Sequence, residues 1–330
     1  MKQRVVWIDY LKGLGMLLVV LYHTQPEGWL FGVAQIPKLA SFFLLAGMFA
    51  SGNLIKTKRL FIPYLSFGLI SFFFWLILRN FGADACSNIA WWKPLWGLVV
   101  GTPFALIQYP PLWFLTCLMV TEVCFCVIHK INQPILQAVI VIILAACGTV
   151  YAHFRPVLPW CISSALVMLP FYWVGNRWKD QLLTLQPPIW LLFVSMIGSL
   201  GLIIVMYLIN GYINVSQAQF GNIGYAYLAM GGTFIFLCSL SQLLLQLPCQ
   251  LRLLSFIGKN SLIYLVTHVT CFSLIKGFAV YIFRVPIDFF SNNIGCILLW
   301  ICSLFLIVPI AWLIRRYCPF LIGSAHESNH

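Results

Sequence analysis

The chain has 330 residues, of which 62% are hydrophobic and only 8% carry a charge, and its mean hydropathy is +0.96. Soluble domains are charged at about a quarter of their positions, so this composition excludes an ordinary soluble protein. It predicts an all-α, polytopic transmembrane helical bundle whose main partner is the lipid bilayer. The formal net charge of +12 calls for no nucleic acid, because basic cytoplasmic loops of a membrane protein account for most of it.

Ten apolar segments are predicted to cross the membrane, with nine or eleven as the alternative counts, since about 20 helical residues span a hydrocarbon core of ~30 Å. In chain order they are 5–24, 34–51, 60–81, 111–129, 134–153, 160–176, 188–209, 222–245, 260–280 and 293–314. The chain, 1–330, is therefore predicted to form one transmembrane domain with a short polar C-terminal tail at 322–330.

Basic residues predict the orientation of these spans. An even number of spans places both termini on the same side of the membrane. With both termini inside, 13 of the 19 lysines and arginines lie on the cytoplasmic side. The positive-inside rule therefore predicts that both termini are cytoplasmic.

The first span, "WIDYLKGLGMLLVVLYH" at 7–23, carries three ionisable residues. A helix turns ~100° and rises ~1.5 Å per residue, so Asp9, Lys12 and His23 share one face, with Lys12 and His23 roughly 16 Å apart. Asp9 and Lys12 are spaced to pair. Such residues usually face the bundle interior or a water-filled cavity. The alternative is that Lys12 extends to the membrane surface and His23 is an interfacial histidine.

A compact basic cluster lies in the turn between the second and third spans, "KTKRLFIPYL". Lys56, Lys58 and Arg59 stand there beside the start of a helix, whose N-terminus adds a partial positive charge. Together they form a candidate anion site. The alternative is that the cluster only anchors the cytoplasmic turn.

Two later spans also hold ionisable residues. Glu122 lies in the fourth span, as a functional acid or as a neutral structural hydrogen bonder. In the ninth, "GKNSLIYLVTH" puts Ser261, Tyr264 and His268 on one helical stripe. The alternative for His268 is a hydrogen-bonded packing role. The polar segment 210–221 is expected at the outer mouth of the bundle.

The first span resembles the signature of the acyltransferase-3 family of integral-membrane O-acyltransferases. That signature has an acid, then a base, then a histidine eleven positions after the base, which here are Asp9, Lys12 and His23. The family's basic-x-x-Arg motif matches Lys56 and Arg59 and is followed, as in relatives, by "PY".

Later motifs resemble the same family in the same order. "PLWFLTCLMV" at 111–120 is similar to the fourth span of the subgroup related to fucose 4-O-acetylases, and "GKNSLIYLVTH" is similar to a late motif that ends in histidine. The chain departs from the pattern at Lys12, where many relatives have arginine, and at Ala46, where a serine is usual.

The resemblance implies a bacterial inner-membrane O-acetyltransferase. No metal is expected, because Cys124 and Cys126 do not have the spacing of metal ligands and no zinc site is visible in the sequence. The enzyme's donor is cytoplasmic acetyl-CoA, and its acceptor is a sugar hydroxyl of a surface glycan or a lipid-linked oligosaccharide. Lys56, Lys58 and Arg59 are then expected to hold the CoA phosphates, and the pantetheine arm to pass Lys12. At the outer end, His23 is expected to act as general base.

The remaining ionisable residues receive supporting roles in this scheme. His268 and Glu122 are expected to line the central cavity, and Asp9 to hold Lys12.

Two other functions fit some of these features. A transporter or flippase for a glycolipid or anionic substrate also uses buried charges and a basic entrance. Transporters commonly contain paired repeats, however, and no repeat is visible in this sequence. A non-catalytic scaffold leaves the polar stripe of the first span unexplained. Release of CoA thiol from acetyl-CoA only when acceptor is present distinguishes an acetyltransferase from both.

The orientation is tested with a reporter fused after His330. The charge distribution predicts that a reporter active only in the cytoplasm works there, and that one active only in the periplasm does not. Periplasmic activity at this position contradicts the predicted topology.

Overall fold

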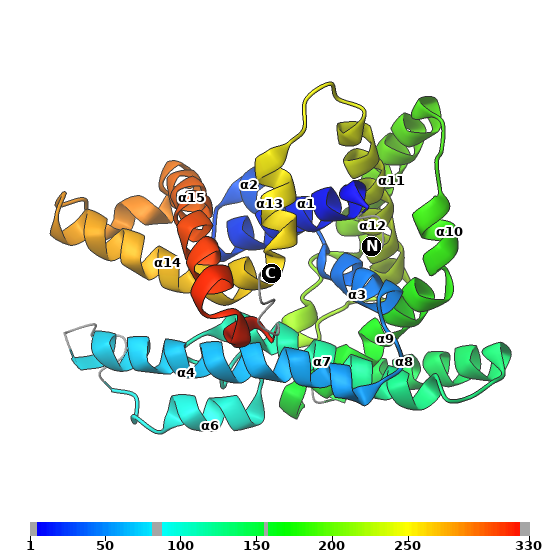
Figure 1. The fold of residues 1–330 in the computed structure, drawn as a ribbon, viewed down its shortest axis with the longest axis horizontal. Helices are drawn as coiled ribbons and strands as arrows, with labels where there is room; N and C mark the ends of the chain where they lie inside the picture. The colour runs from blue at the N-terminus through cyan, green and yellow to red at the C-terminus, as the bar shows by residue number, and fades with distance from the viewer. Residues whose placement is uncertain (1–4, 81–87, 155–157, 324–330) are drawn as a thin grey trace, which may run out of the picture. The chain divides into compact units, whose positions relative to one another are not determined.

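The computed structural model describes residues 5–80, 88–154 and 158–323 (Figure 1). Over these ranges the chain forms helices and no β-strand, which confirms the predicted all-α bundle. Nine helical segments of the described chain are long and apolar enough to cross a membrane. The remaining predicted span corresponds to α9 (Ile162–Arg177), which has 16 residues and contains Pro170. Most of the predicted polar tail, 324–330, lies outside the described residues.

The chain divides into two compact units. Unit 1 comprises Met1–Phe49, Val174–Asn214 and Phe220–Ala311, and unit 2 comprises Ala50–Trp173, Val215–Gln219 and Trp312–His330. The helices that fall wholly or mainly in unit 1 are α1 (Val6–His23), α2 (Gly28–Ala34), α3 (Leu39–Met48), α10 (Lys179–Thr184), α11 (Ile189–Asn210), α12 (Ile223–Leu245), α13 (Arg252–Lys259), α14 (Ser261–Tyr281), η5 (Ile287–Ser291) and α15 (Asn293–Tyr317).

Helix α1 forms the core of unit 1, where it packs on α12, α13 and α14 (Figure 1). Two glycines let α1 and α13 approach to backbone contact. A methyl group on Gly258 would overlap the carbonyl oxygen of Asp9, and one on Gly13 would lie 2.5 Å from the carbonyl oxygen of Leu254. Small residues at such crossings are what allow close helix packing in a membrane.

Hydrogen bonds add to this packing around α1. The backbone N–H of Leu251 donates to the Tyr10 hydroxyl over 3.0 Å, which ties the start of α13 to α1. The indole N–H of Trp300 donates to the carbonyl of Leu17 over 3.0 Å, which ties α15 to α1. Helix α1 is therefore held along its length by partners from distant parts of the chain.

The second predicted span, 34–51, differs from the structure at its start. The apolar segment begins at Gly28 and consists of two helices, α2 and α3, separated by residues 35–38. Pro37 explains the break, because proline lacks an N–H and disfavours helical backbone at the preceding residue. The prediction missed α2 because "GWLFGVA" follows polar residues and is too short to span alone.

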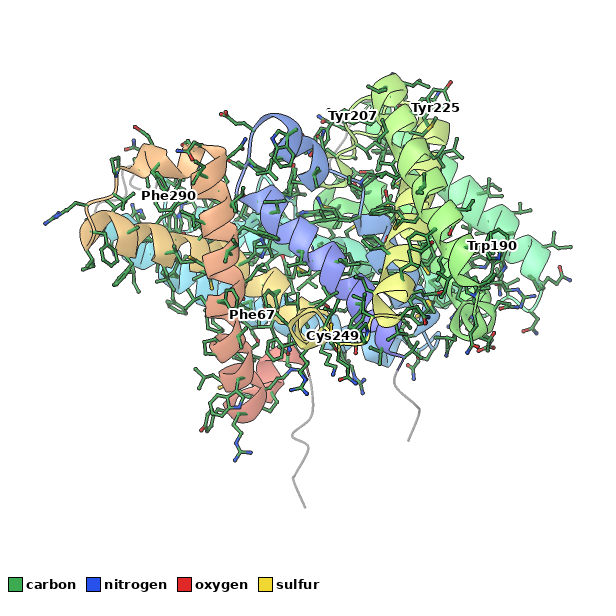
Figure 2. The ribbon with its side chains drawn as sticks, turned by 90° about the horizontal axis from the view of Figure 1, so that it is seen from above. Phe67, Trp190, Tyr207, Tyr225, Cys249 and Phe290 are labelled. Atoms are coloured by element: carbon green, nitrogen blue, oxygen red, sulfur yellow. The ribbon has the colours of Figure 1, made fainter. Side chains whose placement is uncertain are left out.

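Helices α11 and α12 form an antiparallel hairpin in unit 1 (Figure 2). Tyr207 and Tyr225 lie at the end where the connecting segment joins them, and Trp190 lies toward the other end of α11 (Figure 2). All three side chains are exposed. Exposed aromatic residues at both ends of a hairpin are typical of membrane–water interfaces.

Unit 2 is built around α7 (Trp113–Ile128). The other helices with all or most of their residues there are η1 (Leu54–Thr57), α4 (Lys58–Asn80), α6 (Lys93–Val100), η2 (Pro110–Leu112), α8 (Pro134–Phe154), η3 (Pro159–Cys161), α9, η4 (Val215–Gln217) and η6 (Pro319–Ile322). Over an 18-residue stretch of the span that contains α7, 72% of the residues are buried, against 17% over an 18-residue stretch of α8, so α7 is central and α8 peripheral. The Thr121 hydroxyl bonds to the Ala165 carbonyl over 3.2 Å and links α7 to α9.

The α1–α13 contact predicts that Gly258→Ala destabilises the protein, because its methyl group meets the Asp9 carbonyl. Overpacking of this kind costs about 1–3 kcal/mol, so we expect a lower melting temperature of the purified protein. Gly277→Ala in α14 is the matched control, since nothing lies within 4 Å of a methyl group there. Equal melting temperatures for both variants contradict the proposed close packing.

Candidate active site

Two histidines from distant parts of the chain lie against each other in unit 1. His23 is the last residue of α1, and His268 lies two turns into α14. Their ring centroids are 4.9 Å apart, and the ring planes are inclined by 46°. His268 is fully buried, whereas His23 is partly exposed. Of these two imidazoles, a reacting group can therefore reach His23 directly.

Hydrogen bonding orients the His268 ring. Its Nδ1 atom lies 2.8 Å from the carbonyl oxygen of Tyr264, one turn earlier in α14. A carbonyl oxygen only accepts, so this contact assigns the proton to Nδ1 and leaves the lone pair on Nε2. The Tyr264 hydroxyl in turn donates to the carbonyl of Leu304 over 2.9 Å, which fixes α14 on α15. The predicted Ser261–Tyr264–His268 stripe thus has Tyr264 as the structural support of His268.

Lys38 joins His23 at this end of α1. Its ammonium group lies 4.6 Å from the ring centroid of Tyr22 and donates to the carbonyl of Ala34, the last residue of α2. The Tyr22 ring meets the His23 ring edge to face at 5.3 Å. Lys38 is buried and interacts electrostatically with His23. The Lys38 amino group therefore lies close to Tyr22 and His23.

A tyrosine from the segment between α11 and α12 contacts Tyr22. The Tyr212 hydroxyl lies 2.5 Å from the Tyr22 hydroxyl, although the two residues are 190 positions apart in sequence. The polar segment expected at the mouth of the bundle thus packs against the His23 end of α1.

Asp9 and Lys12 lie toward the other end of α1. The helix is unbroken from Val6 to His23, so the predicted rise of roughly 16 Å between Lys12 and His23 holds. Asp9 is buried at the α13 crossing. The Lys12 ammonium lies 5.6 Å from the ring centroid of Phe49, and Lys179 lies 6.0 Å from the same centroid. The pairing of Asp9 with Lys12 stays a prediction.

The predicted basic cluster belongs to unit 2. Lys56 lies in η1, and its side chain is not among those that the structure describes. Lys58 and Arg59 begin α4, and both are exposed. Lys58 also lines a cavity of about 540 Å³ together with Thr57, whose buried hydroxyl has no hydrogen-bond partner within the described part of the chain.

The wall of this cavity is otherwise almost wholly apolar. Its remaining lining residues are Leu54, Phe61, Met119, Val120, Val123, Cys124, Trp160 and Ile162. The basic cluster therefore adjoins a hollow that suits a ligand with an anionic head and an uncharged arm.

Glu122 also belongs to unit 2, on α7. It is partly buried, and its carboxylate interacts electrostatically with Tyr172 and Cys126 of the same unit. These neighbours are compatible with either of its two predicted roles, so its function stays a prediction.

Sequence reasoning missed three residues that pack around the His23 end of α1, namely Lys38, Tyr22 and Tyr212. For Lys38 a signal existed, because a lysine inside an apolar segment is costly unless it has partners. Tyr22 and Tyr212 gave none, since tyrosine is ordinary near the ends of membrane helices. The role of each ionisable residue in catalysis stays a prediction.

Comparison with known proteins gives one match. A family model described as an acyltransferase domain, Acyl_transf_3, matches residues 5–316, which is nearly the whole chain. No curated protein and no solved structure matches the chain. The matched range includes the His23–His268 cluster, the basic cluster and Glu122.

Proposed function

Since the chain belongs to the acyltransferase-3 family of membrane acyltransferases, we propose that it transfers an acetyl group from acetyl-CoA to a sugar hydroxyl. The acceptor is a surface or lipid-linked glycan, and the protein works in the inner membrane of a bacterium. One observation carries the proposal: a partly exposed imidazole, His23, ends a membrane helix against a buried, oriented imidazole, His268. Family membership favours this acyl transfer over the transporter or flippase alternative.

The proposed reaction joins a hydroxyl oxygen to the carbonyl carbon of the thioester. His23 removes the hydroxyl proton as the oxygen attacks, because a neutral sugar hydroxyl is a weak nucleophile. The new C–O ester bond forms and the C–S bond breaks. The proton held by His23 passes to the departing sulfur, so CoA leaves as a thiol and His23 is neutral again.

His268 acts in this scheme through His23 and is a positioning residue. Its ring contacts the His23 ring at 4.9 Å and is itself fixed by the Tyr264 carbonyl. The fixed His268 ring limits the orientations of the His23 ring. His23 therefore loses less conformational freedom when it binds the acceptor hydroxyl. Replacing His268 is therefore expected to slow the reaction less than replacing His23.

The chemistry of the basic cluster supports the donor assignment. CoA carries several phosphates and a long thin pantetheine arm. Lys56, Lys58 and Arg59 supply positive charge for the phosphates, and the adjoining cavity of about 540 Å³ offers an apolar wall for the arm. Asp9 and Lys12 are proposed to line the polar route toward His23, and Glu122 to serve as an inner polar support.

Mass spectrometry of the surface glycan, with and without the gene, identifies the acetylated sugar. Loss of one acetyl group from one residue of the glycan is the expected result.

His23→Ala is expected to lower the rate of acyl transfer by ~10²–10⁴-fold, the usual contribution of a general base. The measurement is the acceptor-dependent release of CoA thiol by membranes with equal protein content. His153→Ala is the matched control, since His153 is an exposed histidine at the end of α8 in unit 2. Transfer within a few-fold of the unchanged protein would show that the base lies elsewhere, with His268 as the next candidate.

Arg59→Ala is expected to raise the KM for acetyl-CoA while leaving the KM for the acceptor nearly unchanged, because a charge-assisted phosphate contact is lost. Arg316→Ala, which also removes one exposed arginine, is the control for charge alone. An unchanged donor KM at normal protein level would assign the cluster to membrane anchoring.

Lys12→Arg is expected to retain activity, since it keeps the charge.

A further inference from the structure

A cavity in unit 1 is separate from the cavity at the basic cluster of unit 2, and the proposed chemistry does not use it. It has a volume of about 270 Å³ and lies between the α2–α3 break and the α11–α12 hairpin. Its wall includes Trp29, Gln35, Ile203, Tyr207 and Tyr212. Ligand sites for whole small molecules usually measure ≈ 300–1,000 Å³, so this cavity suits a segment of a molecule.

Gln35 is the polar exception in a largely apolar wall. Its side chain is only 7% exposed, and neither its amide nitrogen nor its amide oxygen has a hydrogen-bond partner within the described ranges. Leaving buried polar atoms without hydrogen bonds is energetically costly. A buried amide that lines a cavity without a protein partner indicates a ligand that supplies a hydrogen-bonding group at this point.

The rim of the cavity is exposed and apolar. Trp29 is 73% exposed, and Tyr207 lies exposed at the connecting end of the α11–α12 hairpin (Figure 2). Ile204, which also lines the cavity, is exposed on α11. Exposed apolar side chains on a membrane helix face lipid, so a hydrocarbon chain can enter here from the bilayer.

The cavity shares a wall with the candidate active site. Tyr212 lines the cavity, and its hydroxyl contacts that of Tyr22, whose ring packs on His23. Lys38 follows Gln35 by three positions and lies over the same Tyr22 ring. If one segment of a molecule fills the cavity, a polar group attached to that segment therefore lies near Tyr22, Lys38 and His23.

We propose that this cavity binds the hydrocarbon chain next to the sugar of a lipid-linked acceptor, with the Gln35 amide bonded to an oxygen of the linkage. The inference rests on the proposed function and narrows its acceptor from any glycan to a sugar carried on a membrane lipid. The lipid chain then holds the sugar hydroxyl at His23, and the Lys38 ammonium places a positive charge beside the linkage.

The binding test uses a farnesyl phosphate that carries a photoreactive diazirine on its chain, added to the full-length purified protein. After irradiation, mass spectrometry is expected to find the label on peptides from 28–38 and 200–213. Ile203→Trp fills the cavity and is expected to abolish this labelling. Ile197→Trp is the matched control, because Ile197 is an exposed residue of the same helix, α11.

Gln35→Leu separates a binding role from a structural one. Removing an unbonded buried amide is expected to leave the melting temperature of the ligand-free protein unchanged or higher. The same change is expected to weaken binding of the farnesyl phosphate about tenfold, the effect of losing one good hydrogen bond. A lower melting temperature together with unchanged binding would overturn the proposal.

Two further outcomes also overturn it. One is equal labelling of the unchanged protein and of Ile203→Trp. The other is competition by a bilayer phospholipid as strong as that by unlabelled farnesyl phosphate, which would make the cavity a site for bulk lipid. The labelling needs no acyl transfer, so it decides the role of the cavity even if the proposed acetyltransferase activity fails its own test.

Discussion

The packing of α1 against α13 is the contact on which unit 1 depends. A membrane helix that carries an acid, a lysine and a histidine must cover its polar face with protein, because lipid offers these groups no hydrogen bonds. Gly258 and Gly13 let α13 approach α1 until backbone meets backbone, with Asp9 buried at the crossing. The N-terminal half of α1 is thereby enclosed, and the C-terminal end of the helix carries His23, which packs on His268 and remains partly exposed.

The site at that end is assembled from short breaks as much as from long helices. The break at Pro37 separates α2 from α3, and in this break Lys38 lies over the Tyr22 ring while Gln35 lines the neighbouring cavity. Residues 211–222 bring Tyr212 to the same place. Irregular backbone in a membrane protein is tolerated where protein surrounds it or a cavity adjoins it, and a cavity adjoins both segments here.

Polar groups in unit 1 divide into those that bond to the protein and those that remain available. The side chains of Tyr264 and Trp300 donate to backbone carbonyls of neighbouring helices, and the Thr24 hydroxyl donates to the Leu21 carbonyl at the end of its own helix, α1. Gln35 has no such bond within the described chain, and His23 is partly open. Because of this difference, we assign a structural role to the first group and a ligand-binding role to the second. In unit 2, Thr57 and Lys58 stand at a cavity in a comparable way.

The sequence by itself determined the all-α membrane class, the approximate bounds of the spans and the family. It also singled out His23 and His268 as residues to examine. These properties follow from local composition and from helical spacing within one segment, so no knowledge of packing was needed. The one misplaced start, at α2, arose because a seven-residue helix is too short to stand out as a span.

Only the tertiary structure decided which of these residues meet. The contacts of His23 with His268, of Tyr22 with Tyr212 and of Asp9 with Gly258 each join segments about 190 to 250 positions apart. The cavity at Gln35 likewise needs walls from 29–37 and 200–229. Contacts of this range depend on how whole helices pack, and the periodicity of a single segment carries no information about its partner.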